Sequence, residues 1–276
     1  MPAATVFAAT FPTWQVAVGA LLAGFASGVL AALLGIGGAV VTTPVVRLLG
    51  GTPIEAVGST VPAIIPGAIS GAWRYAREGL VHWRIAGVLG VSGAAMAVVG
   101  ALVSDAVEGR VLMVLTAVVM LWAGGSVVWR LRVPGRTGAG VADDADEVPE
   151  APDALVAALG AGAGFIAGLL GVGGGIVIVP VLSGPLRLPM RSAVASSLVA
   201  VATFQVPALV THIWLGHVDW MIAVPLALGV VPGAQVGARL TIAASDRTVR
   251  ALFGMLVVVM AVIYGVSEAR GLLVGS

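Results

Sequence analysis

Two glycine-rich stretches of nearly the same sequence carry the groups best suited to binding a ligand. "GIGGAVVTTP" runs from Gly35 to Pro44, and "GVGGGIVIVP" runs from Gly171 to Pro180. Adjacent glycines allow positive φ angles, and the N–H groups of such turns can point together at an anion. Close helix packing, which small residues also permit in membrane proteins, is the alternative interpretation. We predict anion binding by the backbone at five glycines: Gly37, Gly38, Gly173, Gly174 and Gly175.

Six uncharged polar side chains are further candidate ligands. Two matched pairs of hydroxyl residues follow the glycine-rich stretches, where they either bond to their own helix or contact a substrate. Two glutamines lie well inside apolar segments, where an amide needs a partner or a water-lined cavity. The candidates are Ser59, Thr60, Ser196, Ser197, Gln205 and Gln235.

The other reactive residue types exclude several kinds of site. The chain has no cysteine, so disulfides and thiolate metal sites are excluded. The histidines His82, His212 and His217 are too scattered for a metal motif, and we expect His212 at a membrane interface rather than in a proton relay. No Asp or Glu lies at the middle of an apolar segment, so no carboxylate proton carrier is apparent from the sequence. A net charge of +1 gives no reason to expect nucleic acid binding, and no cofactor is implied.

The elements that carry these residues are apolar throughout. Hydrophobic residues make up 59% of the chain, charged residues 10%, and the mean hydropathy is +1.09. A soluble core of this size could not bury so much apolar surface. We therefore expect an all-α, multi-pass protein of the cell membrane. Segments long enough to cross the bilayer, at roughly 20 residues each, fall at 14–34, 54–76, 83–103, 109–131, 154–170, 190–214, 220–240 and 248–267.

The chain divides into two related halves. Residues 13–131 and 154–270 each hold four segments, and the acidic stretch 132–153 between them is too polar for the bilayer. The glycines and prolines of the two turns lie 136 positions apart, and so do Pro53 and Pro189. Such an internal duplication is typical of transporters built around a pseudo-two-fold axis.

The arginines indicate how the halves are oriented. Eight simple crossings would place seven arginines on each side, which contradicts the positive-inside rule. If the first element of each half turns back at its glycines, eleven arginines lie on one side and three on the other. The three are Arg47, Arg110 and Arg270. This arrangement predicts inverted repeats, with both termini outside and the acidic linker in the cytoplasm.

The returning segments each contain a proline. Pro44 and Pro180 lack an N–H and clash with a regular helix. We therefore predict that the segments 39–49 and 176–182 are irregular and that these prolines break the helix.

The two turns, each followed by a run of small residues and serine or threonine, resemble the sulfite exporter TauE/SafE family. The similarity covers nearly the whole chain apart from the first dozen residues and the linker, although Ala39 stands where the second copy has Gly175. The resemblance implies a secondary transporter of sulfite, sulfoacetate or other small anions that works by alternating access. The coupling ion, proton or sodium, and the oligomeric state are left open.

Two other function classes are weighed against transport. "GVSG" at Gly90 to Gly93 matches the short motif of intramembrane serine proteases, but His212 is the only histidine that could activate Ser92. A non-transporting membrane scaffold would not explain two matched helix breaks. We therefore predict a transporter and not an enzyme.

Overall fold

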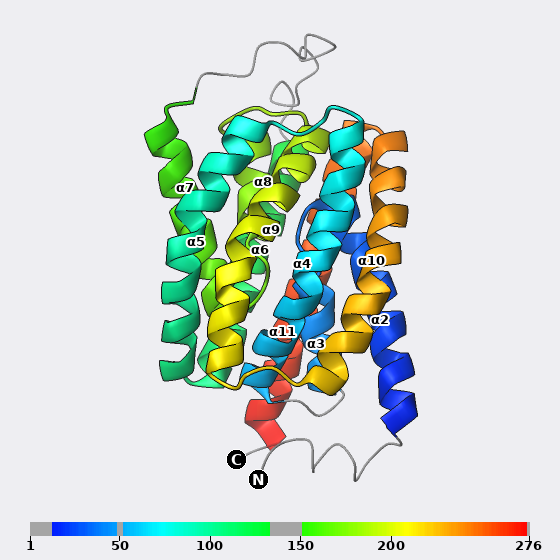
Figure 1. Ribbon diagram of the computed structural model, residues 1–276, viewed down its shortest axis with the longest axis vertical. Helices are drawn as coiled ribbons and strands as arrows, with labels where there is room; N and C mark the ends of the chain where they lie inside the picture. The colour runs from blue at the N-terminus through cyan, green and yellow to red at the C-terminus, as the bar shows by residue number, and fades with distance from the viewer. Residues whose placement is uncertain (1–12, 49–51, 133–150, 275–276) are drawn as a thin grey trace.

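The protein is a bundle of α-helices (Figure 1). The computed structural model describes residues 13–48, 52–132 and 151–274, and these residues form ten helices and no strand. The helices are α2 (Thr13–Leu34), α3 (Ala39–Leu48), α4 (Pro53–Arg77), α5 (Trp83–Ala106), α6 (Gly109–Arg132), α7 (Asp153–Leu170), α8 (Gly175–Ser183), α9 (Met190–Trp214), α10 (Trp220–Ala243) and α11 (Asp246–Val274).

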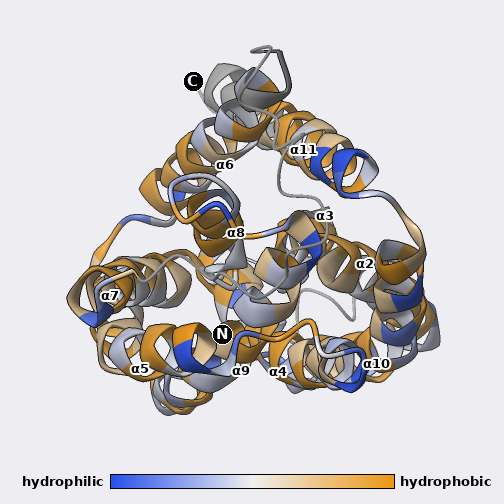
Figure 2. Cartoon of the chain, turned by 90° about the horizontal axis from the view of Figure 1, so that it is seen from above, coloured by the Kyte–Doolittle hydropathy of each residue, from blue (hydrophilic) through white to orange (hydrophobic). Residues whose placement is uncertain are grey.

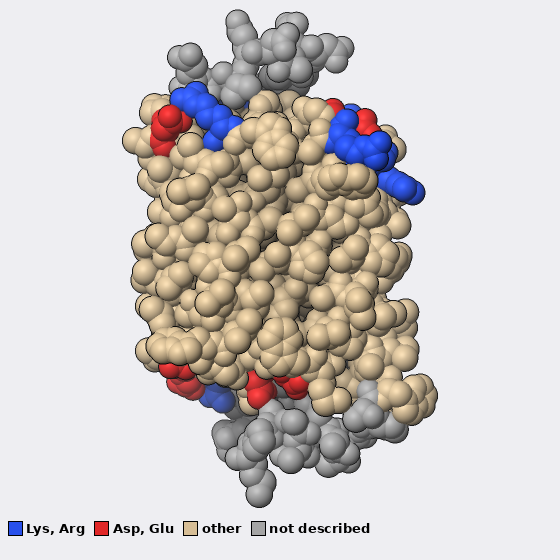
Figure 3. All heavy atoms as spheres, viewed as in Figure 1, with Lys and Arg blue, Asp and Glu red and all other residues tan. Residues whose placement is uncertain are grey.

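The outer surface fits a lipid bilayer. Within the described residues, seven helices are long and apolar enough to cross a membrane: α2, α4, α5, α6, α7, α9 and α10. All seven tryptophans are at least 51% exposed, although tryptophan is a highly buried residue in soluble proteins. On the face shown in Figure 3, charged side chains lie only at the two ends. The expected polytopic membrane protein is therefore confirmed.

Six of the long helices pack in three pairs, and α4 and α9 contact each other. α2 lies against α10, α7 against α5, and α6 against α11. Viewed along the bundle, α3 and α8 lie inside the ring that these helices form (Figure 2). The pairs α2–α10 and α7–α5 each join one half of the chain to the other, so neither half packs by itself.

Small residues bring these pairs close together. A Cβ added at Gly28 of α2 would overlap the backbone of Val230 in α10, and one at Gly164 of α7 would overlap the backbone of Gly93 in α5. Membrane helices associate through such close backbone approaches. Many of the glycines are thus packing residues, and only the two turns require a separate explanation.

The observed helices follow the predicted segments closely. The eighth predicted segment falls within α11, which is not one of the seven candidate spans. The acidic linker lies almost wholly at 133–150, outside the described residues. The start of α2 and the end of α11 lie at one end of the bundle, and the end of α6 and the start of α7 lie at the other (Figure 1).

The prediction of irregular returning segments is wrong. α3 and α8 are helices that continue through positions 44 and 180, and each helix break lies at the glycines before them. Since α8 begins at Gly175, Pro180 lies in its second turn, where the missing N–H removes a single backbone hydrogen bond. Membrane helices tolerate such prolines because neighbouring groups satisfy the freed carbonyls, and α10 likewise contains Pro225 and Pro232.

Candidate functional site

The two glycine turns meet at the centre of the bundle. A Cβ built on Gly173 would lie 3.3 Å from the Cα of Gly37 and 3.0 Å from the carbonyl oxygen of Ile36. A Cβ built on Gly37 would lie 3.3 Å from Cγ1 of Val201 and 3.4 Å from Cγ2 of Ile64. Ile64 and Val201 are at the midpoints of α4 and α9. The turns therefore touch at about half the depth of the membrane.

Backbone conformation makes glycine necessary at this contact. Gly37 and Gly173 have φ angles of +88° and +86°, and the next residue in each turn also has positive φ. An L-residue in this region costs about 1 to 2 kcal/mol. The duplicated glycines are therefore explained by the sharp reversal between α2 and α3 and between α7 and α8.

Two helix N-termini converge on the same point. α3 begins directly after Gly38 and α8 directly after Gly174, and the two helices extend toward opposite ends of the bundle (Figure 1). Among the described residues, the N–H groups of Gly38, Ala39, Gly174 and Ile176 donate to no backbone carbonyl. Unpaired N–H groups give a helix N-terminus partial positive charge, so the centre favours an anion.

An unpaired amide lies on the helix face that lines this centre. Val194, Ser197 and Val201 of α9 contact the first glycine turn. Gln205 follows Val201 by four residues and therefore lies on the same face of α9. Its side chain is completely buried, and neither Nε2 nor Oε1 has a hydrogen-bond partner among the described residues. A buried amide without partners is costly, so Gln205 is a candidate ligand-binding group.

Two of the four predicted hydroxyls hold the turns. Ser197 Oγ donates to the carbonyl of Gly35 at 3.0 Å, and Thr60 Oγ1 lies 3.4 Å from the carbonyl of Gly171. Each hydroxyl also bonds to its own helix, at Val194 and Val57 respectively. Both hydroxyls thus connect a helix of one half to the turn of the other half. Their second contact is a bond to their own helix, which was the alternative role expected for these residues.

The other two hydroxyls hold loops. Ser59 Oγ accepts from the N–H of Asp219 at 2.8 Å, and Ser196 Oγ accepts from the N–H of His82 at 2.9 Å. His82 and Asp219 directly precede α5 and α10. These serines therefore fix the starts of two membrane helices, and in the described residues neither forms a hydrogen bond with a glycine turn.

Gln235 differs from Gln205. Its Nε2 donates to both the carbonyl and the hydroxyl of Ser70, each at 2.8 Å. This links α10 to α4, with the amide nitrogen fully engaged. The structure thus leaves only one of the two predicted glutamines free to take a ligand.

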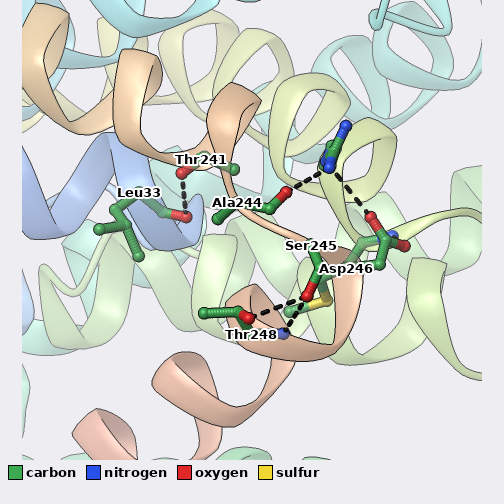
Figure 4. Close-up of polar contacts among 8 residues, drawn as sticks. Leu33, Thr241, Ala244, Ser245, Asp246 and Thr248 are labelled. Carbon is green, nitrogen blue, oxygen red and sulfur yellow. Dashed lines mark hydrogen bonds and ion pairs between the residues drawn. The ribbon is translucent and has the colours of Figure 1, made fainter.

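Sequence reasoning missed the residues that bind the ends of α2 and α7. Tyr75 donates its hydroxyl to the carbonyl of Ala32 at 2.7 Å. Thr241 donates to the carbonyl of Leu33 at 2.9 Å, as Figure 4 shows. In the other half, Nε2 of His212 lies 3.2 Å from the carbonyl oxygen of Gly168. Tyr75 and His212 occupy corresponding positions of the two halves, and this is the signal that could have found them.

In the part of the chain that the structure describes, Ser92 has no catalytic partner. Its hydroxyl donates to the carbonyls of Val88 and Leu89 on its own helix, at 2.8 and 3.3 Å. His212 contacts His217 and Gly168 instead. The geometry that a serine nucleophile requires is therefore not formed by these residues.

Comparisons with known proteins identify the family. The family model described as Sulfite exporter TauE/SafE matches residues 20–264. The chain belongs to the sulfite exporter TauE/SafE family. The match covers both halves and both glycine turns, so the resemblance expected from the turns is confirmed.

The relatives of this TauE/SafE chain are named as transporters. A "Probable membrane transporter protein" of Xylella fastidiosa (strain 9a5c) is 31% identical over 248 residues, covering 87% of this chain and 90% of that protein. "Probable membrane transporter protein YunE" of Bacillus subtilis (strain 168) is 26% identical, covering 79% and 84%. "Probable membrane transporter protein MJ0441" of Methanocaldococcus jannaschii is 22% identical, covering 87% and 92%. No solved structure matches the chain significantly.

Proposed function

We propose that this chain is a secondary transporter of small anions, with sulfite and related sulfur oxyanions as the substrate class. Membership of the family supports membrane transport, and the helix N-termini at the site support a preference for negative charge. The observation that carries the proposal is the buried, unpaired amide of Gln205, next to a centre where two helix N-termini meet. Its Nε2 and the N–H groups of the turns would together donate to the oxyanion.

Alternating access follows from the same arrangement. Both turns are buried from either end, so a substrate reaches them only when the helices around the turns move. We propose that the halves are inverted repeats that rock about the contact of Gly37 and Gly173. Supporting this, α2 packs on α10 as α7 packs on α5, and matched hydroxyls bind the turn of the opposite half.

The test separates binding from stability. We expect Gln205→Leu to weaken sulfite binding by about tenfold or more, since a hydrogen bond to a charged group contributes about 1.5 to 3 kcal/mol. The same substitution should leave the thermal midpoint unchanged or raise it, because it removes a buried amide that has no partner. Affinity is measured by calorimetry on purified protein in detergent, and stability by thermal unfolding.

Gln235→Leu is the matched control. It deletes an amide that is bound to Ser70, so it should lower the thermal midpoint and leave sulfite affinity unchanged. If Gln205→Leu binds sulfite as tightly as the wild type, the anion site does not lie at this centre.

A further inference from the structure

Three titratable side chains form a continuous chain from the surface to the end of α7. Nε2 of His217 lies 3.0 Å from Oδ1 of Asp105, and Nδ1 of His217 lies 3.1 Å from Nδ1 of His212. Nε2 of His212 lies 3.2 Å from the carbonyl oxygen of Gly168. The Asp105 side chain is 57% exposed, whereas both histidines are buried. These three side chains therefore connect solvent to the last turn of α7, just before the second glycine turn.

The hydrogen-bond contacts of Asp105, His217 and His212 can accommodate one extra proton. The three contacts need three hydrogens, but two neutral imidazoles carry only two N–H groups and a carboxylate carries none. When both histidines are neutral, two acceptor atoms must therefore face each other in one of the three contacts. When one proton is added, His217 donates to Asp105, the two Nδ1 atoms share a hydrogen, and His212 donates to Gly168. Protonation thus decides whether all three contacts hold.

Glu108 and Arg110 follow Asp105 by three and five residues at this end, but in the described residues neither forms a hydrogen bond or ion pair with a histidine. Glu55 of α4 is bound to Thr52, and the side chain of Asp219 accepts from the N–H of Met221. α7 has a single titratable residue, Asp153, at its opposite end, and the charged residues Arg84 of α5 and Arg191 of α9 also lie at the far ends of their helices. Asp105 is the carboxylate in contact with the pair.

The corresponding contact in the other half cannot respond to pH in the same way. There the carbonyl of Ala32 accepts from the hydroxyl of Tyr75. A tyrosine hydroxyl keeps its proton throughout the range in which histidine titrates. The end of α2 is therefore held permanently, whereas the end of α7 is held by a group that gains and loses a proton.

We propose that Asp105, His217 and His212 are the proton-coupling site of this transporter, where one proton taken from solvent fastens the carbonyl of Gly168 and so the α7 side of the second glycine turn. Loss of the proton leaves two acceptors facing each other in one of the three contacts, so the end of α7 is held less firmly. The coupling of the proton to transport rests on the proposed function, but proton binding by the cluster does not.

The proposal is tested by nuclear magnetic resonance on ¹⁵N-histidine-labelled protein in lipid nanodiscs. The chain has only three histidines, so their imidazole nitrogens can be assigned with single substitutions. As the pH is lowered, we expect His212 and His217 to take up a single proton together. His82 lies before α5, and burial lowers its pKa below its ordinary value of 6.5, so it serves as an independent reference. Separate uptake of two protons, or of none, would overturn the proposal.

Asp105→Asn is the decisive variant because it supplies the missing hydrogen without charge. An asparagine amide can donate to Nε2 of His217, after which the neutral pair satisfies all three contacts. We expect proton uptake by the pair to move at least about one pH unit lower, with the fold intact since Asp105 is largely exposed. Unchanged uptake in this variant would contradict the assignment.

Transport provides the second arm. In proteoliposomes, Asp105→Asn and His212→Gln should still carry sulfite down its own gradient and should lose the acceleration that an imposed pH gradient gives the wild type. Acceleration that persists in both variants overturns the coupling role. Absence of sulfite transport in the wild type would instead contradict the proposed function, while the proton count from the resonance experiment would stand.

Discussion

At the scale of single residues, the glycines of the two turns differ in how much room surrounds them. A Cβ on Gly174 would lie 2.6 Å from Cζ of Phe204 and 3.0 Å from the carbonyl oxygen of Ala163. A Cβ on Gly38 would lie 2.9 Å from the hydroxyl of Ser27, whose hydrogen bond to the carbonyl of Gly38 would have to give way, but no backbone atom lies closer than 3.8 Å. Both residues have positive φ, so the difference between them is steric.

Gly174→Ala should therefore weaken sulfite binding more than Gly38→Ala. Each alanine adds about 1 to 2 kcal/mol of backbone strain, and in Gly174→Ala the fixed carbonyl of Ala163 forces the turn itself to shift. Affinity and membrane expression are measured together for each variant. Gly162→Ala is the control, because Gly162 lies in the same half with no heavy atom within 4 Å of its Cβ position, and it should bind sulfite normally. Losses that merely follow expression would make the turns packing devices.

Residue type and spacing predicted part of this site and could not predict the rest. The glycine turns and Gln205 were predictable because duplication and an amide inside an apolar segment are visible in the sequence. The different surroundings of Gln205 and Gln235 were not, since they depend on Ser70 of another helix. His212 was expected at an interface, yet it is buried, because its partners His217 and Gly168 are brought to it by the turn after α9 and by the packing of α7 against α9.

At the scale of helices, hydropathy determined most of the boundaries. Long apolar runs end where charges and turn residues begin. The ends of the predicted segments therefore lie within one residue of the ends of α4 and α9. The returning segments were mispredicted, because a proline in the second turn of a helix removes only a single backbone hydrogen bond, which membrane helices tolerate. Tertiary contacts also determine the end of α2, because its last carbonyls accept hydrogen bonds from Tyr75 and Thr241.

Tyr75→Phe should destabilise the protein by about 1 to 3 kcal/mol, because it leaves the buried carbonyl of Ala32 without a donor. The measurement is the apparent free energy of unfolding in detergent. Thr203→Val is the control, since Thr203 is exposed and bonds only to its own helix at Val199, and it should change stability by less than about 0.5 kcal/mol. Equal effects of the two substitutions would show that α2 needs no external donor.

At the scale of the whole molecule, the glycine turns decide on which side each loop lies. If the chain crossed the membrane at every predicted segment, the loops at Glu108 and Pro185 would share one side. If α2–α3 and α7–α8 each turn back, these two loops lie on opposite sides, because α7 and α8 together make no net crossing. The positive-inside rule favours the second arrangement and places Pro185, next to Arg187 and Arg191, in the cytoplasm.

Single cysteines test this directly, because the natural chain has none. Both Glu108 and Pro185 are exposed, so Glu108→Cys and Pro185→Cys should each accept a maleimide. In intact cells a membrane-impermeant maleimide should label only Glu108→Cys, and Pro185→Cys should react only after permeabilisation. Labelling of both variants from the same side would restore eight simple crossings, and the two turns could then not face each other across an inverted repeat.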